Sequence, residues 1–85
     1  MTSNRKVDQE VGSRLREKRL INRISVNEFA AKLGVSPEQL DRFERGDERI
    51  PAVELRDACI LLDTNIMFFF DSLVGHERAS AQRVR

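Results

Sequence analysis

Signals that start and stop helices follow one another closely in the middle of the chain. Ser25 precedes a helical pattern of apolar residues as an N-cap residue would, and Gly34 stands where a left-handed residue ends a helix. A second start signal, Ser36 followed by Pro37, comes directly afterwards, and Gly46 closes the next helical segment. Two short helices joined by about three residues with a glycine are the signature of a helix-turn-helix.

The small and apolar residues of these two segments fit a tight crossing. Ala30 is small at the point where the two helices would cross, and Leu40 and Phe43 have the spacing that turns both into a core. The outer face of the second helix would then carry Pro37, Glu38, Asp41, Arg42 and Arg45. Such a helix can present its outer side to a DNA major groove, but helical bundles that bind no DNA contain the same hairpin.

Apolar residues recur at helical spacing elsewhere, and neither strict alternation nor β-branched clusters indicate strands. The sequence therefore predicts an all-α fold, a compact five-helix domain. Its helices are expected over residues of about 8–22, 26–33, 37–45, 51–62 and 66–73. The corresponding organisation is a flexible N-terminal arm (1–7), a helix-turn-helix domain (8–74) and a polar C-terminal tail (75–85).

The chain has 85 residues with one cysteine and one histidine, which limits its size and its chemistry. This length allows one small domain. The lone Cys59 excludes an internal disulfide and a cysteine-based zinc site, and the isolated His76 leaves little scope for acid–base catalysis. No long apolar run or signal peptide is visible. We expect a cytoplasmic, nucleoid-associated protein that is no enzyme, uses no cofactor or metal, takes no small-molecule substrate and binds no membrane.

The formal net charge of +1 conceals an uneven distribution. Residues 1–23 contain seven basic and three acidic side chains, whereas residues 24–48 contain three basic and six acidic ones. Residues 49–74 are again acidic, and residues 75–85 are basic. Basic clusters favour contact with nucleic-acid phosphates. The N-terminal block and the tail therefore favour DNA, and the acidic middle opposes it.

Four stretches resemble the xenobiotic-response-element / Cro–CI family of helix-turn-helix regulators, in particular small repressor-like proteins of α-proteobacteria. They are Val11–Arg16, Ser25–Ser36, Leu40–Gly46 and Phe68–Asp71, and their Ala…Leu-Gly-Val-Ser and Phe-Glu-Arg-Gly runs are specific in combination. The resemblance implies a five-helix, lambda-repressor-like domain that acts as a homodimer on a palindromic operator. We therefore expect a sequence-specific DNA-binding transcription regulator, a homodimeric repressor.

The resemblance also implies roles for individual residues. The positions that it places against double-stranded DNA are Arg19, Asn27, Ser36, Pro37, Glu38, Gln39, Arg42, Arg45 and Arg49. In addition, Arg19 falls where a family arginine commonly pairs with the glutamate near the end of the recognition helix, here Glu44. For each arginine taken singly, a solvated surface role is the alternative.

Two positions depart from the family pattern. Many members have glutamine where this chain has Val26 and Glu38. Glu38 can accept a hydrogen bond from cytosine N4 but cannot make the bidentate adenine contact of glutamine, and Asp41 adds a second negative charge. A different function therefore stays open: a protein-interaction module, the partner of another regulator or of a toxin, with an acidic docking helix.

Residues 67–70, Met-Phe-Phe-Phe, are the most apolar stretch of the chain. We expect Ile66, Phe69 and Phe70 to face the core and Phe68 to face outward. Exposed apolar residues of a small domain are usually covered by a partner. The residues predicted to form a symmetric dimer interface are Ile60, Leu61, Phe68 and Leu73. Packing within one core is the alternative.

Overall fold

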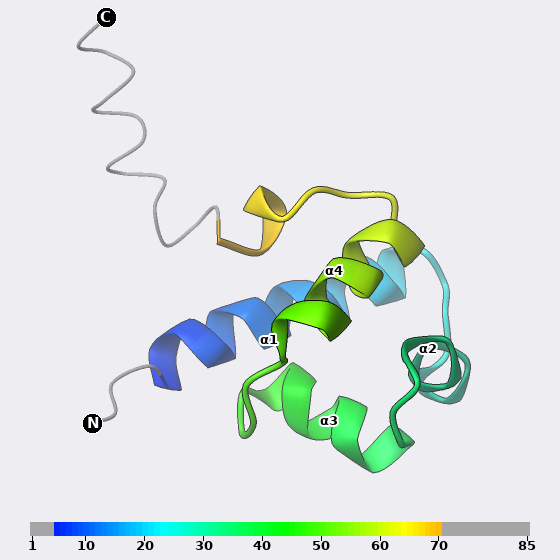
Figure 1. Cartoon of the computed structure of the whole chain (residues 1–85), viewed down its shortest axis with the longest axis horizontal. Coiled ribbons are helices and arrows are strands. Elements are labelled where there is room, and N and C mark those ends of the chain that lie inside the picture. The colour runs from blue at the N-terminus through cyan, green and yellow to red at the C-terminus, as the bar shows by residue number, and fades with distance from the viewer. Residues whose placement is uncertain (1–4, 71–85) are drawn as a thin grey trace, which may run out of the picture.

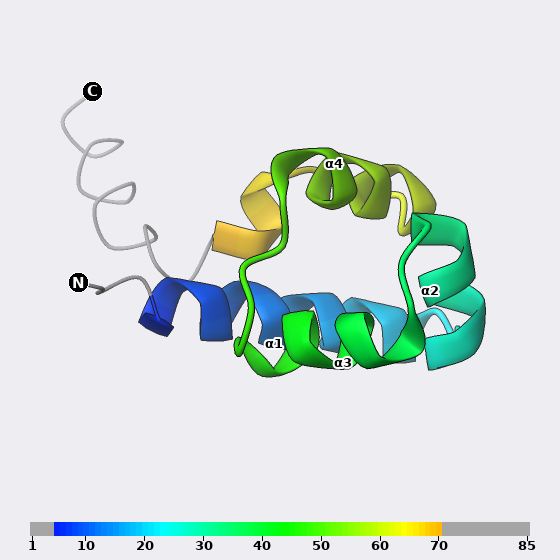
Figure 2. The same ribbon diagram turned by 60° about the horizontal axis from the view of Figure 1, so that its bottom comes forward.

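The computed structural model describes residues 5–70, and this part of the chain consists of helices connected by turns and short loops. Its elements are α1 (Arg5–Ile21), α2 (Val26–Leu33), α3 (Pro37–Arg45) and α4 (Ala52–Leu61), followed by a fifth helical segment at residues 67–70. Figure 1 shows the long α1 with α3 along one side and α4 along another. Figure 2 shows α2 at one end of this arrangement. The all-α, five-helix fold predicted from the sequence is confirmed.

The caps of α2 and α3 are those that the sequence predicts. Ser25 Oγ accepts a hydrogen bond from the Glu28 backbone N–H at 3.1 Å, and Ser36 Oγ accepts one from the Gln39 N–H at 3.0 Å. Gly34 and Gly46 end the two helices with φ of 80° and 78°, in the left-handed region that glycine adopts without a Cβ penalty. The start, turn and end of the motif are therefore fixed by local interactions.

Two helix boundaries differ from the prediction. Helix α1 begins at Arg5, so residues 5–7, which the sequence analysis assigned to an N-terminal arm, are helical. Pro51 is the N-cap of α4 and not its first helical residue, and it provides no side-chain cap. Neither change moves the helix-turn-helix.

The core lies between α1, α2, α3 and α4, and the fifth segment adds Phe69 to it. Its fully buried large side chains are Leu15, Phe29, Leu40, Phe43, Leu62 and Phe69. Ala30 is completely buried, as the tight crossing of α2 and α3 requires. Ile66 is 43% exposed, so the prediction that it faces the core was wrong. The turn before the fifth segment holds Ile66 outside and leaves Phe69 to fill the interior.

Helices α1 and α3 approach each other at two glycines. A methyl group placed on Gly12 of α1 would overlap the backbone carbonyl oxygens of Phe43 and Glu44. A methyl group on Gly46 would lie 2.5 Å from Cα of Gln9. Since backbone atoms cannot rotate away, only glycine fits at these positions, and α3 is set closely against α1.

Candidate nucleic-acid interface

Arg19 and Glu44 join α1 to α3 through a buried ion pair. Arg19 Nε donates to Glu44 Oε2 at 2.7 Å, and Arg19 Nη2 donates to Glu44 Oε1 at 3.0 Å. Arg19 Nη1 also donates to the backbone oxygen of Ile24 at 2.8 Å, so the same guanidinium holds the loop that leads to α2. Arg19 and Glu44 are 5% and 7% exposed. The predicted pairing of these two residues is present, and it lies in the interior.

The outer side of α3 carries four of the nine residues predicted to meet DNA. Leu40 and Phe43 point into the core, which leaves the opposite side of the helix in solvent. An open hollow of about 500 Å³ on this side is lined by Val26 of α2 and by Pro37, Glu38, Asp41, Arg42 and Arg45 of α3. The structure therefore brings together Pro37, Glu38, Arg42 and Arg45 on one surface, with the acidic Asp41 among them.

Each exposed arginine of the predicted interface has a carboxylate partner. Arg45 Nε lies 3.1 Å from Asp41 and its Nη2 lies 3.4 Å from Asp47. Arg49 Nε donates to Asp8 at 2.9 Å. Exposed pairs of this kind contribute about 0–1 kcal/mol, so exchanging such a carboxylate for a phosphate costs little free energy. The acidic residues of the motif thus neutralise its arginines locally.

Glu48, which was not among the predicted site residues, contacts two of them. Its Oε1 accepts from Arg42 Nε at 2.9 Å, and its Oε2 accepts from Gln39 Nε2 at 3.2 Å. These hydrogen bonds, above all the one from Arg42, lower the pKa of the Glu48 carboxyl from its ordinary value of 4.5. Glu48 follows the helix in a loop, where no periodicity indicates the direction of a side chain. The only available signal was the charge opposite to that of Arg42.

The remaining predicted contacts are dispersed. Asn27 is exposed in the first turn of α2, and the Ser36 hydroxyl is engaged as the α3 cap. Glu38 is exposed and has no hydrogen bond or ion pair with another residue of the described range 5–70. Arg49 lies apart from the hollow on α3.

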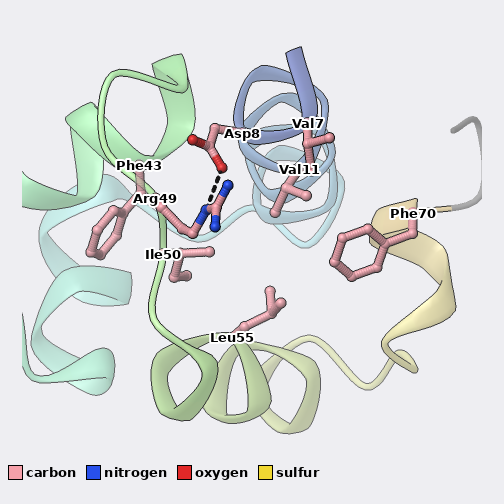
Figure 3. A pocket seen from close by; sticks show the side chains of 8 residues that line it. All are labelled: Val7, Asp8, Val11, Phe43, Arg49, Ile50, Leu55 and Phe70. Carbon is pink, nitrogen blue, oxygen red and sulfur yellow. Dashed lines mark hydrogen bonds and ion pairs between the residues drawn. The ribbon is translucent and has the colours of Figure 1, made fainter. Parts of the chain in front are cut away.

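Arg49 lies at the edge of a second, largely apolar cavity of about 310 Å³. Arg49 and its partner Asp8 line this cavity together with apolar side chains (Figure 3). The other lining residues are Val7, Val11, Phe43, Ile50, Leu55 and Phe70. Arg49 is therefore held toward α1, away from the surface formed by α3.

The residues predicted to form the dimer interface differ in exposure. Ile60 is 71% exposed, whereas Leu61 and Phe68 are half-buried and pack against the core. Phe68 is covered by Arg14 and Lys18, whose charged groups lie 5.2 and 5.1 Å from its ring centroid. The prediction that Phe68 faces outward was therefore wrong. Leu73 lies outside the described residues. Val53, 56% exposed on α4, was not anticipated.

The described residues contain no group of His, Cys, Asp and Glu side chains that could hold a metal ion. Between residues 5 and 70, no helix combines the length and the apolar character that crossing a membrane requires.

Helices α2 and α3 are joined by a glycine turn, and α3 is held against the long α1. This arrangement defines a helix-turn-helix domain of lambda-repressor-like fold. Residues 15–58 match the helix-turn-helix family HTH_3, and the chain belongs to this XRE/Cro–CI family of transcriptional regulators. The family resemblance noted in the sequence is confirmed. The family consists of regulators and not of enzymes, in agreement with the prediction.

Sequence relatives come from α-proteobacteria. A helix-turn-helix-type transcriptional regulator from Sinorhizobium medicae is 30% identical over 69 residues, which cover 81% of this chain and 50% of the relative. A transcriptional regulator in the ATPase CF(0) region of Rhodospirillum rubrum is 37% identical over 67 residues, which cover 79% of this chain and 62% of the relative. The chain therefore spans about half or somewhat more of the length of these curated relatives.

Solved structures share the fold. The restriction-modification controller protein C.AhdI from Aeromonas hydrophila superimposes with a TM-score of 0.67 and 26% identity, covering 73% of this chain and 94% of that protein. The clp gene regulator ClgR from C. glutamicum gives a TM-score of 0.73 with 24% identity, covering 82% of this chain and 91% of that one. The second likeness concerns the fold alone.

Proposed function

We propose that this protein is a sequence-specific DNA-binding regulator of transcription that reads the major groove with α3. The observation that carries the proposal is how α3 is held. The buried Arg19–Glu44 pair and the close contact at Gly12 fix its inner side, and Arg42 and Arg45 stand on its free outer side. A rigidly held helix with an exposed polar face suits insertion into the groove. The sequence relatives named as transcriptional regulators support this function.

We assign the contacts by position and chemistry. Arg42, Gln39 and Glu38 face base edges, and Pro37 packs beside them at the start of α3. The groups assigned to the phosphate backbone are Ser36, Arg45 and Asn27, together with Arg49, which lies outside the hollow, beside α1. Arg19 acts through Glu44 by holding α3 in place, since all three of its nitrogens already donate within the protein.

We further propose that the regulator is a homodimer that pairs through α4, consistent with a palindromic operator. Val53 and Ile60 are seven residues apart on α4 and therefore share one face. Both are exposed, as are Ile66 and Met67 after the helix. A second copy of the chain would cover these apolar side chains, and the two-fold axis would place two α3 helices on successive turns of DNA.

DNA binding measured over a series of salt concentrations tests the function directly. We expect affinity for random duplex DNA to fall steeply with salt, because the arginines of the interface displace counterions from phosphates. Selection from a genomic library should enrich one palindromic sequence. Arg42→Ala should weaken binding to that sequence, and Arg16→Ala, at an exposed arginine on α1, is the matched control. A flat salt dependence with no enriched sequence would instead support the protein-interaction module, for which the unpaired Glu38 is available.

A further inference from the structure

The loop after α3 folds back onto the last turn of that helix. The backbone N–H groups of Asp47 and Glu48 both donate to the carbonyl oxygen of Arg42, at 2.9 and 3.3 Å. Gly46 makes this return possible through its left-handed φ of 78°. The backbone itself therefore places Glu48 beside Arg42.

The Glu48 carboxylate engages only the inner edge of the Arg42 guanidinium. Its Oε1 accepts from Nε, and Oε2 is occupied by the Gln39 amide. The terminal nitrogens Nη1 and Nη2 of Arg42 donate to no residue in the described part of the chain. The Arg42 and Glu48 side chains are 47% and 38% exposed, so this end of the guanidinium is open to solvent at the hollow on α3.

An arginine held in this way matches the acceptor pattern of one base. Guanine presents O6 and N7 together in the major groove, and the commonest specific contact to it is a bidentate one from arginine. The planar guanidinium can donate from Nη1 and Nη2 to these two acceptors while Nε remains bonded to a carboxylate. This hydrogen bond restricts the rotamers of the Arg42 side chain before DNA binds. Less conformational entropy is therefore lost on binding.

We propose that Glu48 is a positioning residue that orients Arg42 through Nε, so that its two terminal nitrogens read a guanine in the operator. The inference rests on the proposed DNA-binding function. Glu48 also carries a negative charge that disfavours phosphates. Its presence therefore raises the ratio of specific to non-specific binding in two ways: it orders the reading group, and it weakens contacts that do not depend on sequence.

The test uses the full chain, the site selected by the wild-type protein and two variants of Glu48. The base read by Arg42 is identified as the position whose preference disappears in Arg42→Ala. We expect Glu48→Ala to lower the discrimination between guanine and adenine at that position about tenfold, the range of a single bidentate contact. Affinity for random DNA should rise in the same variant, because a negative charge is lost.

Glu48→Gln separates positioning from charge. Its amide oxygen can still accept from Arg42 Nε, and Gln39 can turn its own amide to present an acceptor. We expect this variant to retain the guanine preference while its affinity for random DNA rises. Glu17→Ala is the charge control, since Glu17 is an exposed carboxylate on α1, and it should change neither quantity.

The outcomes distinguish the two proposals. If Glu48→Ala keeps the full guanine preference and binds selected and random DNA more tightly by the same factor, Glu48 only competes with phosphate, and the positioning role is overturned while the proposed function stands. If Arg42→Ala loses no guanine preference at any position, the positioning role is overturned as well. If the wild-type chain enriches no sequence, the proposed function fails and the role of Glu48 fails with it.

Discussion

Arg19 and Glu44 are 25 positions apart in the chain, yet they share two hydrogen bonds in the interior. Removal of one partner leaves the other charge buried without compensation, which typically costs about 3–5 kcal/mol. We therefore expect Arg19→Ala to lower the free energy of unfolding by about that amount, measured by urea denaturation.

The exposed Arg16 provides the control, since Arg16→Ala should change stability by less than about 0.5 kcal/mol. The double variant Arg19→Met/Glu44→Leu should be more stable than Arg19→Ala, because it buries no unpaired charge. A mild effect of Arg19→Ala, equal to that of Arg16→Ala, would show that the pair does not hold α3.

Gly12→Ala tests the close approach of α1 and α3. Alanine is favoured in a helix by about 1 kcal/mol over glycine, but its methyl group would overlap the Phe43 and Glu44 carbonyls. We expect a net destabilisation of about 1–3 kcal/mol, seen as a lower Tm. The exposed neighbour Ser13 is the control, and Ser13→Ala should leave Tm unchanged or slightly raised. Stabilisation by Gly12→Ala would contradict the packing described here.

The contact between Arg42 and Glu48 can be followed by carboxyl titration in NMR. The pKa of Glu48 is lowered by Arg42 and Gln39, so its midpoint should lie below 4.5. Between this midpoint and pH 4.5, the unfolded chain binds more protons than the folded protein. The free energy of unfolding therefore rises with pH in this range, and this contribution is lost as the pH falls through the folded pKa. Arg42→Ala should return the midpoint toward 4.5, and Arg56→Ala should not move it. An ordinary midpoint in the wild-type protein would show that the contact is absent in solution.

Cys59 offers a pH probe inside α4. It is half-buried, and burial raises the pKa of its thiol. Because only the thiolate reacts with alkylating reagents, we expect modification of the native protein to be slower than that of the unfolded chain, with a pH midpoint shifted upward. Stability should fall at alkaline pH, where the unfolded chain releases the thiol proton first. Equal rates for native and urea-unfolded protein would exclude this burial.

The proposed dimer face on α4 is tested by Ile60→Glu. The side chain is 71% exposed in the single chain, so the change should leave the fold intact by circular dichroism. Sedimentation should nevertheless change from dimer to monomer. Ser13→Glu, an equally simple surface change on α1, should remain dimeric. A wild-type chain that sediments as a monomer at micromolar concentration would refute the interface.

The helix-turn-helix could be predicted because its determinants are local. Ser25 and Ser36 cap their helices through residues three positions later, and Gly34 and Gly46 end them by their own backbone conformation. Short-range patterns of this kind can be read without knowing the tertiary environment. The outer face of α3 could be predicted from the helical period of its apolar residues, because Leu40 and Phe43 mark its inner side.

The features that could not be predicted depend on contacts between elements. The need for glycine at position 12 arises from the carbonyls of α3, and the side-chain direction of Glu48 follows from the turn at Gly46. Phe68 was expected to be outward because helical spacing alone cannot show that Arg14 and Lys18 cover its ring. Ile66 was misplaced because helical spacing cannot show that the fifth segment begins only at residue 67 and leaves Ile66 in the turn before it.

The carboxylates beside Arg45 and Arg49 have a consequence for the ionic atmosphere of the protein. Each acts as a covalently tethered counterion, at a fixed and high local concentration that dilution cannot lower. In the proposed DNA complex these carboxylates are displaced but not released, and they attract cations from solution as they separate from their arginines. The net release of ions is then smaller than the number of arginines suggests. Binding should retain more of its strength as salt rises than it would with an arginine face free of acidic neighbours.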